Sequence, residues 1–122
     1  MAYNGRSSFK LNRALALVEG FTAQTLSGDT TLTVKDSQFQ AIDPGGAGRN
    51  VTLPAGDVRG RFMFIANKAD ADESIVLLQP DGSSVAATVS QNDMAIIYAT
   101  DDIADGASSG WSLFFMVSGA IT

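Results

Sequence analysis

Two short segments of the chain are rich in acidic residues. They contain Asp70, Asp72 and Glu73 in the first, and Asp101, Asp102 and Asp105 in the second. Carboxylates of this kind bind hard cations, so either segment offers ligands for Ca²⁺. Neither has the glycine and the distal glutamate of an EF-hand, and aspartate is common in turns because its side chain hydrogen-bonds the local backbone. We therefore interpret both segments as solvated turns and predict no metal site.

The residue types on which most enzymes depend are missing or scarce. The chain has no histidine and no cysteine, which excludes Ser-His-Asp and Cys-His catalysis, thiolate zinc sites and disulfides. Its only glutamates are Glu19 and Glu73, so a carboxylate pair for glycoside cleavage is not expected. The glycine-rich segment 43–49 lacks the GK[ST] of a P-loop. The sequence predicts no enzymatic activity and no cofactor.

Two aromatic residues carry side chains that could stack on sugars or bases. Trp111 and Tyr98 both stand within apolar runs. Aromatic side chains in such runs usually pack in a core or an interface, where they bury a large apolar area. We expect both residues to pack in this way and not to bind a ligand.

The charge of the chain is unevenly distributed. The net charge is −5 and the pI is about 4.3, so the protein is expected to repel phosphate backbones and not to bind nucleic acid. The first eighteen residues differ, because they contain Arg6, Lys10 and Arg13 and no acid. The sequence shows no convincing signal peptide and no apolar stretch long enough to cross a membrane.

Residues 1–29 are expected to form an N-terminal arm. Leu11, Leu15 and Val18 have helical spacing, whereas the alternation over 13–17 fits an extended strand, so both conformations remain open. Arginine is well suited to two-point contacts with carboxylates. We expect the arm to reach an acidic protein surface through five cationic and aromatic residues, namely Tyr3, Arg6, Phe9, Lys10 and Arg13. The alternative is an ordinary terminal element folded on its own domain.

Residues 30–122 are expected to form an all-β domain. Runs of strand length recur between turns rich in Gly, Pro, Asn and Asp. This pattern predicts about eight short strands in an antiparallel β-sandwich or barrel, jelly-roll-like in outline. No alternation of strand and helix patterns is visible, which argues against a parallel α/β sheet.

Several predicted strands are apolar on both faces. Phe62 and Phe64 point to one face of their strand, whereas Met63 and Ile65 point to the other. A small two-layer domain has one interior, so the second apolar face needs a cover. We expect a homo-oligomer whose interface candidates are Met63, Ile65, Phe114 and Met116. The alternatives are that the arm covers this face, or that the strands are central and buried on both sides.

The stretch from residue 39 to residue 111 resembles a small β module of phage virion proteins. The likeness rests on the turn Asp43–Gly46 before Arg49–Pro54, on the strand over Gly60–Asn67, and on the late pair Gly110-Trp111. This module occurs in capsid decoration proteins, head fibres and tail-fibre segments. The resemblance implies a homotrimer without enzymatic activity.

The short length favours one member of this group. Tail fibres are long and repetitive, whereas this chain of 122 residues has no visible internal repeat. We expect a capsid decoration protein, assembled in the host cytoplasm, that binds the major capsid protein on the virion surface and stabilises the shell. The alternative is a receptor- or glycan-binding module of a phage fibre or adhesin, which would use exposed loops such as 100–110.

Overall fold

The computed structural model describes residues 20–119, and all regular structure in this range is β-strand, as the sequence predicted. Nine strands follow one another along the chain: β1 (Phe21–Thr25), β2 (Thr30–Thr31), β3 (Phe39–Asp43), β4 (Arg49–Thr52), β5 (Phe62–Asn67), β6 (Ile75–Leu78), β7 (Val85–Val89), β8 (Met94–Ala99) and β9 (Trp111–Val117). The all-β prediction is therefore confirmed.

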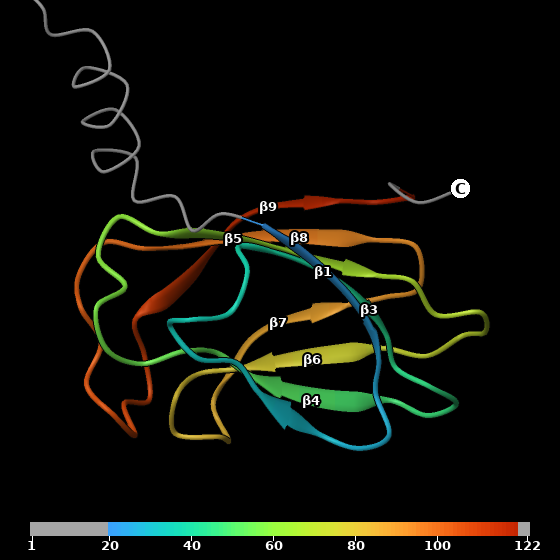
Figure 1. Ribbon diagram of the computed structural model, residues 1–122, viewed down its shortest axis with the longest axis horizontal. Coiled ribbons are helices and arrows are strands. Elements are labelled where there is room, and N and C mark those ends of the chain that lie inside the picture. The colour runs from blue at the N-terminus through green and yellow to red at the C-terminus, as the bar shows by residue number, and fades with distance from the viewer. Residues whose placement is uncertain (1–19, 120–122) are drawn as a thin grey trace, which may run out of the picture.

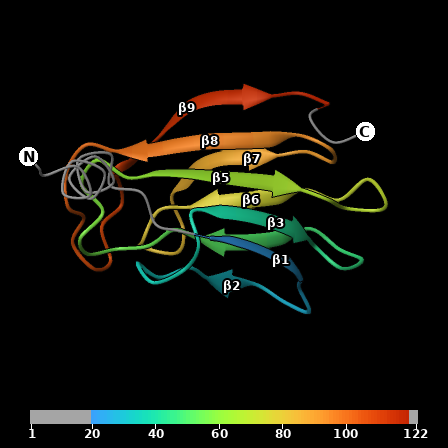
Figure 2. The same ribbon diagram turned by 45° about the horizontal axis from the view of Figure 1, so that its top comes forward.

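The chain winds back and forth between two sheets (Figure 1, Figure 2). Sheet A has the strand order β1-β3-β5-β8-β9, and sheet B has the order β2-β4-β6-β7. Because β1 to β6 alternate between the sheets, β1, β3 and β5 are parallel neighbours, and so are β2, β4 and β6. Antiparallel pairs arise where β7, β8 and β9 join the sheets. The predicted antiparallel pairing is thus wrong for the pairs among the first six strands, and the described strands form no closed barrel.

The turn after β3 shows how the sequence directs this winding. The Asp43 carboxylate accepts a hydrogen bond from the backbone N–H of Gly45 at 2.9 Å. Gly45 has a φ of +82°, and a Cβ added there would clash with the backbone carbonyl oxygen of Leu26. Only glycine satisfies both the backbone angle and this close approach. The turn then carries the chain from sheet A into β4 of sheet B.

A hydrophobic core lies between the sheets and draws on both of them. Sheet A contributes Ile42, Met63, Ile65, Ala95 and Ile97, and sheet B contributes Val51, Ile75, Leu77, Ala87 and Val89. Met63 and Ile65, two of the predicted oligomer-interface candidates, have no exposed surface and lie in this core. The reason is that sheet B covers this side of β5, which leaves Phe62 and Phe64 on the outer side.

A buried asparagine joins the ends of three strands. Asn67 is fully buried at the end of β5, and its Nδ2 donates hydrogen bonds to the carbonyl oxygens of Glu73 and Val89 at 2.8 and 2.9 Å. Its Oδ1 accepts a hydrogen bond from the backbone N–H of Ala69 at 2.9 Å. Its own backbone pairs with the turn before β8 through Asn92 and Asp93. This side chain therefore satisfies backbone groups of the loop before β6 and of the end of β7.

A second buried amide fixes the start of β9. Gln79 follows β6, and its Nε2 donates to the carbonyl oxygen of Trp111 at 2.9 Å while its Oε1 accepts from the Trp111 backbone N–H at 3.1 Å. The indole Nε1 of Trp111 donates to the carbonyl oxygen of Pro54 at 2.8 Å. Trp111, which is 3% exposed, thereby ties the first residue of β9 to two segments that follow strands of sheet B.

Strand β1 corrects the predicted limit of the N-terminal arm. The arm was expected to extend to residue 29, but Phe21–Thr25 pair with β3 along their whole length. The backbone N–H of Leu26 also donates to the carbonyl oxygen of Asp43 at 2.8 Å, and the Leu26 side chain lies in the core. The folded β domain therefore begins before residue 29, and β1 is an edge strand of sheet A.

The Asp81 turn between β6 and β7 predicts a specific dependence of stability on acid. Hydrogen bonds from the Ser84 hydroxyl and from the backbone N–H groups of Ser84 and Ser83 lower the pKa of Asp81 to about 2. A carboxylate whose pKa is lower in the folded state stabilises that state above its unfolded pKa, and this stabilisation is lost as the pH falls through the folded pKa. We expect Asp81→Asn to lower the melting temperature at pH 7.

This difference in melting temperature should shrink as the pH falls from about 4 to about 2, because the wild-type carboxylate then becomes protonated. Thermal unfolding at a series of pH values measures it. Asp57→Asn is the control, since among the described residues the exposed Asp57 side chain accepts no hydrogen bond. A constant difference between Asp81→Asn and wild type from pH 7 to pH 2 would contradict the prediction.

Candidate interaction surface

The side of sheet A that faces away from the core carries three rows of uncharged side chains. The first row crosses all five strands through Phe21, Phe39, Phe64, Ile96 and Phe115. The second contains Phe62 and Tyr98, and the third contains Ala23, Ala41, Ala66, Met94 and Val117. Because the side-chain period of a strand is two, these rows share one side of the sheet. We call this side the outer face of sheet A.

Three phenylalanines of the first row, on β1, β3 and β5, form a ladder of neighbouring rings. The ring centroids of Phe21 and Phe39 are 5.4 Å apart, and those of Phe39 and Phe64 are 5.8 Å apart with nearly parallel planes. Parallel pairing in register brings these residues side by side on β1, β3 and β5. Such cross-strand aromatic pairs stabilise a sheet, and here they also form a continuous ridge on its surface.

A second aromatic group lies near β9. A β-bulge between Ile96 and Ile97 shifts the register of the β8–β9 pair, and Phe114 lies against Phe62 and Tyr98. The Phe114 ring meets these two rings edge to face, with centroids 5.8 and 6.1 Å apart. At these separations the rings are in contact, so the group forms a packed apolar surface.

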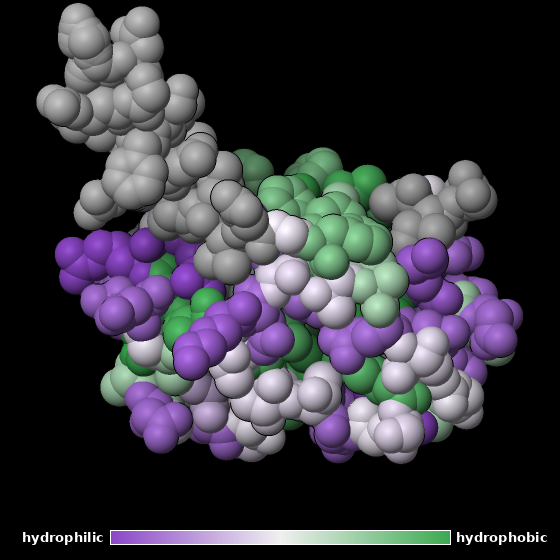
Figure 3. All heavy atoms as spheres, viewed as in Figure 1, coloured by the Kyte–Doolittle hydropathy of each residue, from purple (hydrophilic) through white to green (hydrophobic). Residues whose placement is uncertain are grey.

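Much of this aromatic surface is exposed to water. The exposed fractions are 62% for Phe21, 37% for Phe62, 63% for Phe114 and 57% for Phe115. Figure 3 shows the hydrophobic side chains gathered on the upper side of the molecule, over sheet A. The four rings expose roughly 400 Å² if a phenylalanine buries about 200 Å² when fully covered. Patches of this size commonly mark sites of contact with another molecule.

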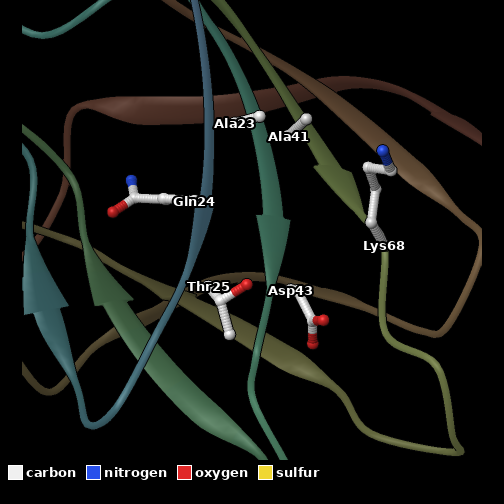
Figure 4. A pocket seen from close by; sticks show the side chains of 6 residues that line it. All are labelled: Ala23, Gln24, Thr25, Ala41, Asp43 and Lys68. Atoms are coloured by element: carbon white, nitrogen blue, oxygen red, sulfur yellow. The ribbon is translucent and has the colours of Figure 1, made fainter.

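A shallow hollow borders the phenylalanine ladder at the ends of β1 and β3 (Figure 4). It has a volume of about 390 Å³ and is lined by Ala23, Gln24, Thr25, Ala41, Asp43 and Lys68. Gln24 points away from the alanines, and its Nε2 donates to Oε1 of the buried Gln40 at 3.0 Å. The hollow thus forms where the side chains beside the phenylalanine ladder are small. The charged side chains of Asp43 and Lys68 also line this hollow.

The structure places the predicted contact residues in different environments. Phe114 is exposed on the outer face, as an interface candidate must be, and Met116 is half-buried against the core. Met63 and Ile65 lie inside the core, as described above. The five arm residues, Tyr3, Arg6, Phe9, Lys10 and Arg13, lie outside the described residues. The sequence did not single out Phe21, Leu113 or Phe115, although all three are among the most exposed large apolar side chains.

The fold brings Asp43, which is distant in the sequence, close to the first acidic segment. Carboxylate oxygens of Asp43, Asp70 and Glu73 lie within 4.8 Å of one another, because the turn after β3 packs on the loop after β5. Asp72 is not part of this group. Calcium takes six to eight oxygen ligands, and three single carboxylate oxygens do not make up such a shell. The absence of a metal site at this group remains our prediction.

The second acidic segment has a structural role in the loop before β9. Asp102 Oδ1 accepts a hydrogen bond from the backbone N–H of Arg59 at 3.1 Å, and Asp101 forms an exposed ion pair with the Arg59 side chain at 3.8 Å. Residues 100–110 line a hollow of about 220 Å³ without an aromatic side chain. Among the described residues this loop therefore offers no ring on which a sugar could stack.

Trp111 and Tyr98 both pack, as expected. Trp111 is buried in the core, with its indole N–H satisfied by Pro54. Tyr98 is half-buried and lies 5.9 Å from Phe62 and 6.1 Å from Phe114 between ring centroids. Trp111 is therefore unavailable to a ligand, whereas Tyr98 contributes to the outer face of sheet A.

Comparison with protein-family models, curated proteins and solved structures finds no match to this chain. Within residues 20–119 no helix is long and apolar enough to cross a membrane. The outer face of sheet A is therefore interpreted from its own chemistry, as a mainly apolar, aromatic surface suited to contact with another protein.

Proposed function

We propose that this chain is a non-catalytic structural protein of a phage virion, a capsid decoration protein that attaches to the shell as a homo-oligomer and stabilises it. The observation that carries the proposal is the outer face of sheet A, with its three rows of uncharged side chains and its exposed phenylalanines from β1 to β9. Covering such a face removes apolar surface from water, which favours association. The virion setting is supported by the sequence resemblance to a small β module of phage virion proteins.

The proposed mechanism combines two contacts with different chemistry. The two sheets, packed as a β-sandwich, present sheet A, with its exposed aromatic surface, to other copies of the chain. The N-terminal arm, with its three cations in the first eighteen residues, contacts acidic groups on the major capsid protein. Linking several arms in one oligomer converts weak single contacts into strong overall binding. Bridging neighbouring capsid subunits would then oppose their separation under internal pressure.

The arm contact predicts a loss of capsid binding when its charges are removed. We expect the combined substitution Arg6→Ala, Lys10→Ala and Arg13→Ala to weaken binding about tenfold, since three exposed ion pairs contribute about 0.5 kcal/mol each. The remaining binding should depend less on salt concentration. Co-sedimentation with empty capsids at several salt concentrations measures both effects.

A matched control removes three positive charges from the described domain. Lys35, Arg59 and Lys68 are all exposed there, and their replacement by alanine should leave capsid binding nearly unchanged. Equal losses in the two triple variants would show that overall charge, not the arm, governs binding. The proposed function itself is contradicted if the chain is absent from purified virions of the phage that encodes it, as determined by mass spectrometry.

A further inference from the structure

Strand β9 is an edge strand with unusual apolar exposure. It is the longest strand of the fold and stands at the end of sheet A, where β8 is its only partner among the described strands. No charge or proline occurs within Trp111–Val117, so of the devices that commonly keep edge strands from pairing, β9 has only the β-bulge opposite Ile96 and Ile97. The opposite edge, β1, is shorter and carries polar residues at three of its five positions.

The exposed apolar surface of β9 lies on both sides of the sheet. Phe115 pairs with Ile96 on the outer face, whereas Leu113 pairs with Ile97, whose side chain lies in the core. Leu113 therefore faces the side of sheet A that is turned toward sheet B, yet it is 42% exposed. A molecule that lay only on the outer face would cover Phe115 and leave Leu113 in water. A strand added at the free edge of β9 would flank both side chains.

We infer that a second copy of this chain pairs with the free edge of β9, so that sheet A continues from one copy into the next. This inference rests on the proposed homo-oligomer and places its contact at the edge of sheet A, with two copies where the sequence resemblance implies three. The β9 strand of a second copy has the required features, since it is equally long, equally apolar on both sides and free of charge. Antiparallel pairing of two identical strands has a two-fold axis and closes at two copies.

The exposed area at this edge indicates how tight the pair should be. Leu113, Phe114 and Phe115 together expose roughly 300 Å² per copy, taking about 200 Å² for a phenylalanine and somewhat less for leucine. The total for two copies is then about 600 Å² of apolar surface, with backbone pairing in addition. Interfaces below about 1,200 Å² belong to weak, reversible complexes. We therefore expect a dimer with a dissociation constant in the micromolar range or weaker.

Sedimentation of the full chain and four lysine variants, from low micromolar to about millimolar concentration, tests this pairing. Leu113→Lys and Phe114→Lys place a charge on either side of β9 and should each weaken the dimer about tenfold or more. Phe21→Lys, at the other edge of the outer face, should leave the dimer unchanged. Val85→Lys is the control on sheet B, because Val85 is 61% exposed on β7.

Comparing the Leu113→Lys and Phe21→Lys variants distinguishes a failure of β9 pairing from a failure of the proposed function. If Phe21→Lys and Phe114→Lys weaken association and Leu113→Lys does not, copies meet face to face, and pairing at β9 is overturned while the proposed function stands. A wild-type mass of three copies also overturns pairing at β9. A wild-type chain that stays monomeric, or that sediments only with lipid vesicles, overturns both.

Amide hydrogen exchange gives a second readout that needs no substitution. In a β9 pair, the backbone N–H groups on the free edge become hydrogen-bonded, so exchange over residues 111–117 should slow as the protein concentration rises. Exchange over β7, the edge of sheet B, should not change. Exchange over residues 111–117 that is independent of concentration, in a sample whose mass shows dimers, would overturn the pairing.

Discussion

Replacing Trp111 with alanine is expected to lower the free energy of unfolding by about 4 kcal/mol, as large aromatic truncations in cores do. The side chain is 3% exposed, and its indole N–H is the hydrogen-bond partner of the Pro54 carbonyl oxygen. The substitution opens a cavity between the sheets and leaves that carbonyl without its partner. The loss is large because domains of this size are stable by only about 5–15 kcal/mol.

Urea unfolding followed by circular dichroism measures this loss, since the chain has one tryptophan and the variant loses its fluorescence signal. Trp111→Phe is the matched control. It keeps most of the apolar volume and removes the indole N–H, so we expect a loss of about 1–2 kcal/mol. An alanine variant that unfolds at the wild-type urea concentration would show that Trp111 does not hold the start of β9 in place.

Replacing Asn67 with alanine is expected to cost about 3 kcal/mol. This fully buried amide is the partner of the Ala69 N–H and of the Glu73 and Val89 carbonyl oxygens. Each buried group left without a partner costs about 1–3 kcal/mol, reduced where water can enter. Asn67→Asp has the same size and should cost at least as much, because a carboxylate cannot donate to the two carbonyl oxygens.

Asn50→Ala is the control for this prediction, because Asn50 is an exposed strand asparagine whose side chain makes no hydrogen bond among the described residues. We expect a change below about 0.5 kcal/mol there. Hydrogen exchange should also show early opening of residues 68–74 in the Asn67 variant. Equal stability of the two alanine variants would mean that the Asn67 network does not hold the end of β5.

The class of fold could be predicted because strands and turns are marked by residue types within short stretches of the sequence. Apolar runs of strand length marked β5, β8 and β9 near their observed positions, and glycine-rich turns separated them. Strand pairing, in contrast, joins residues that are far apart in the sequence. When the chain alternates between two sheets, the spacing between parallel paired residues varies, so the sequence shows no repeat of fixed length. Paired residues are 18 positions apart for Phe21 and Phe39 but 25 positions apart for Phe39 and Phe64. No repeat was therefore visible, and the parallel pairing was missed.

The choice of core face could not be made from strand periodicity. In β5 both faces are apolar, so Phe62 and Phe64 are as hydrophobic as Met63 and Ile65. Which pair is buried depends on where sheet B lies, and that position follows from pairing between distant residues. The buried amides Asn67 and Gln79 were missed for a related reason. Each follows an apolar run and looks like the start of a turn, although its side chain completes contacts between strands.

The most direct measurement of the central claim is the mass of the full-length chain by light scattering over a range of concentrations. The exposed aromatic face of sheet A predicts a mass above the 12.7 kDa of one chain, rising with concentration, and a smaller rise for Phe114→Ser. A folded wild-type protein whose mass stays at 12.7 kDa up to its solubility limit would contradict association through this face.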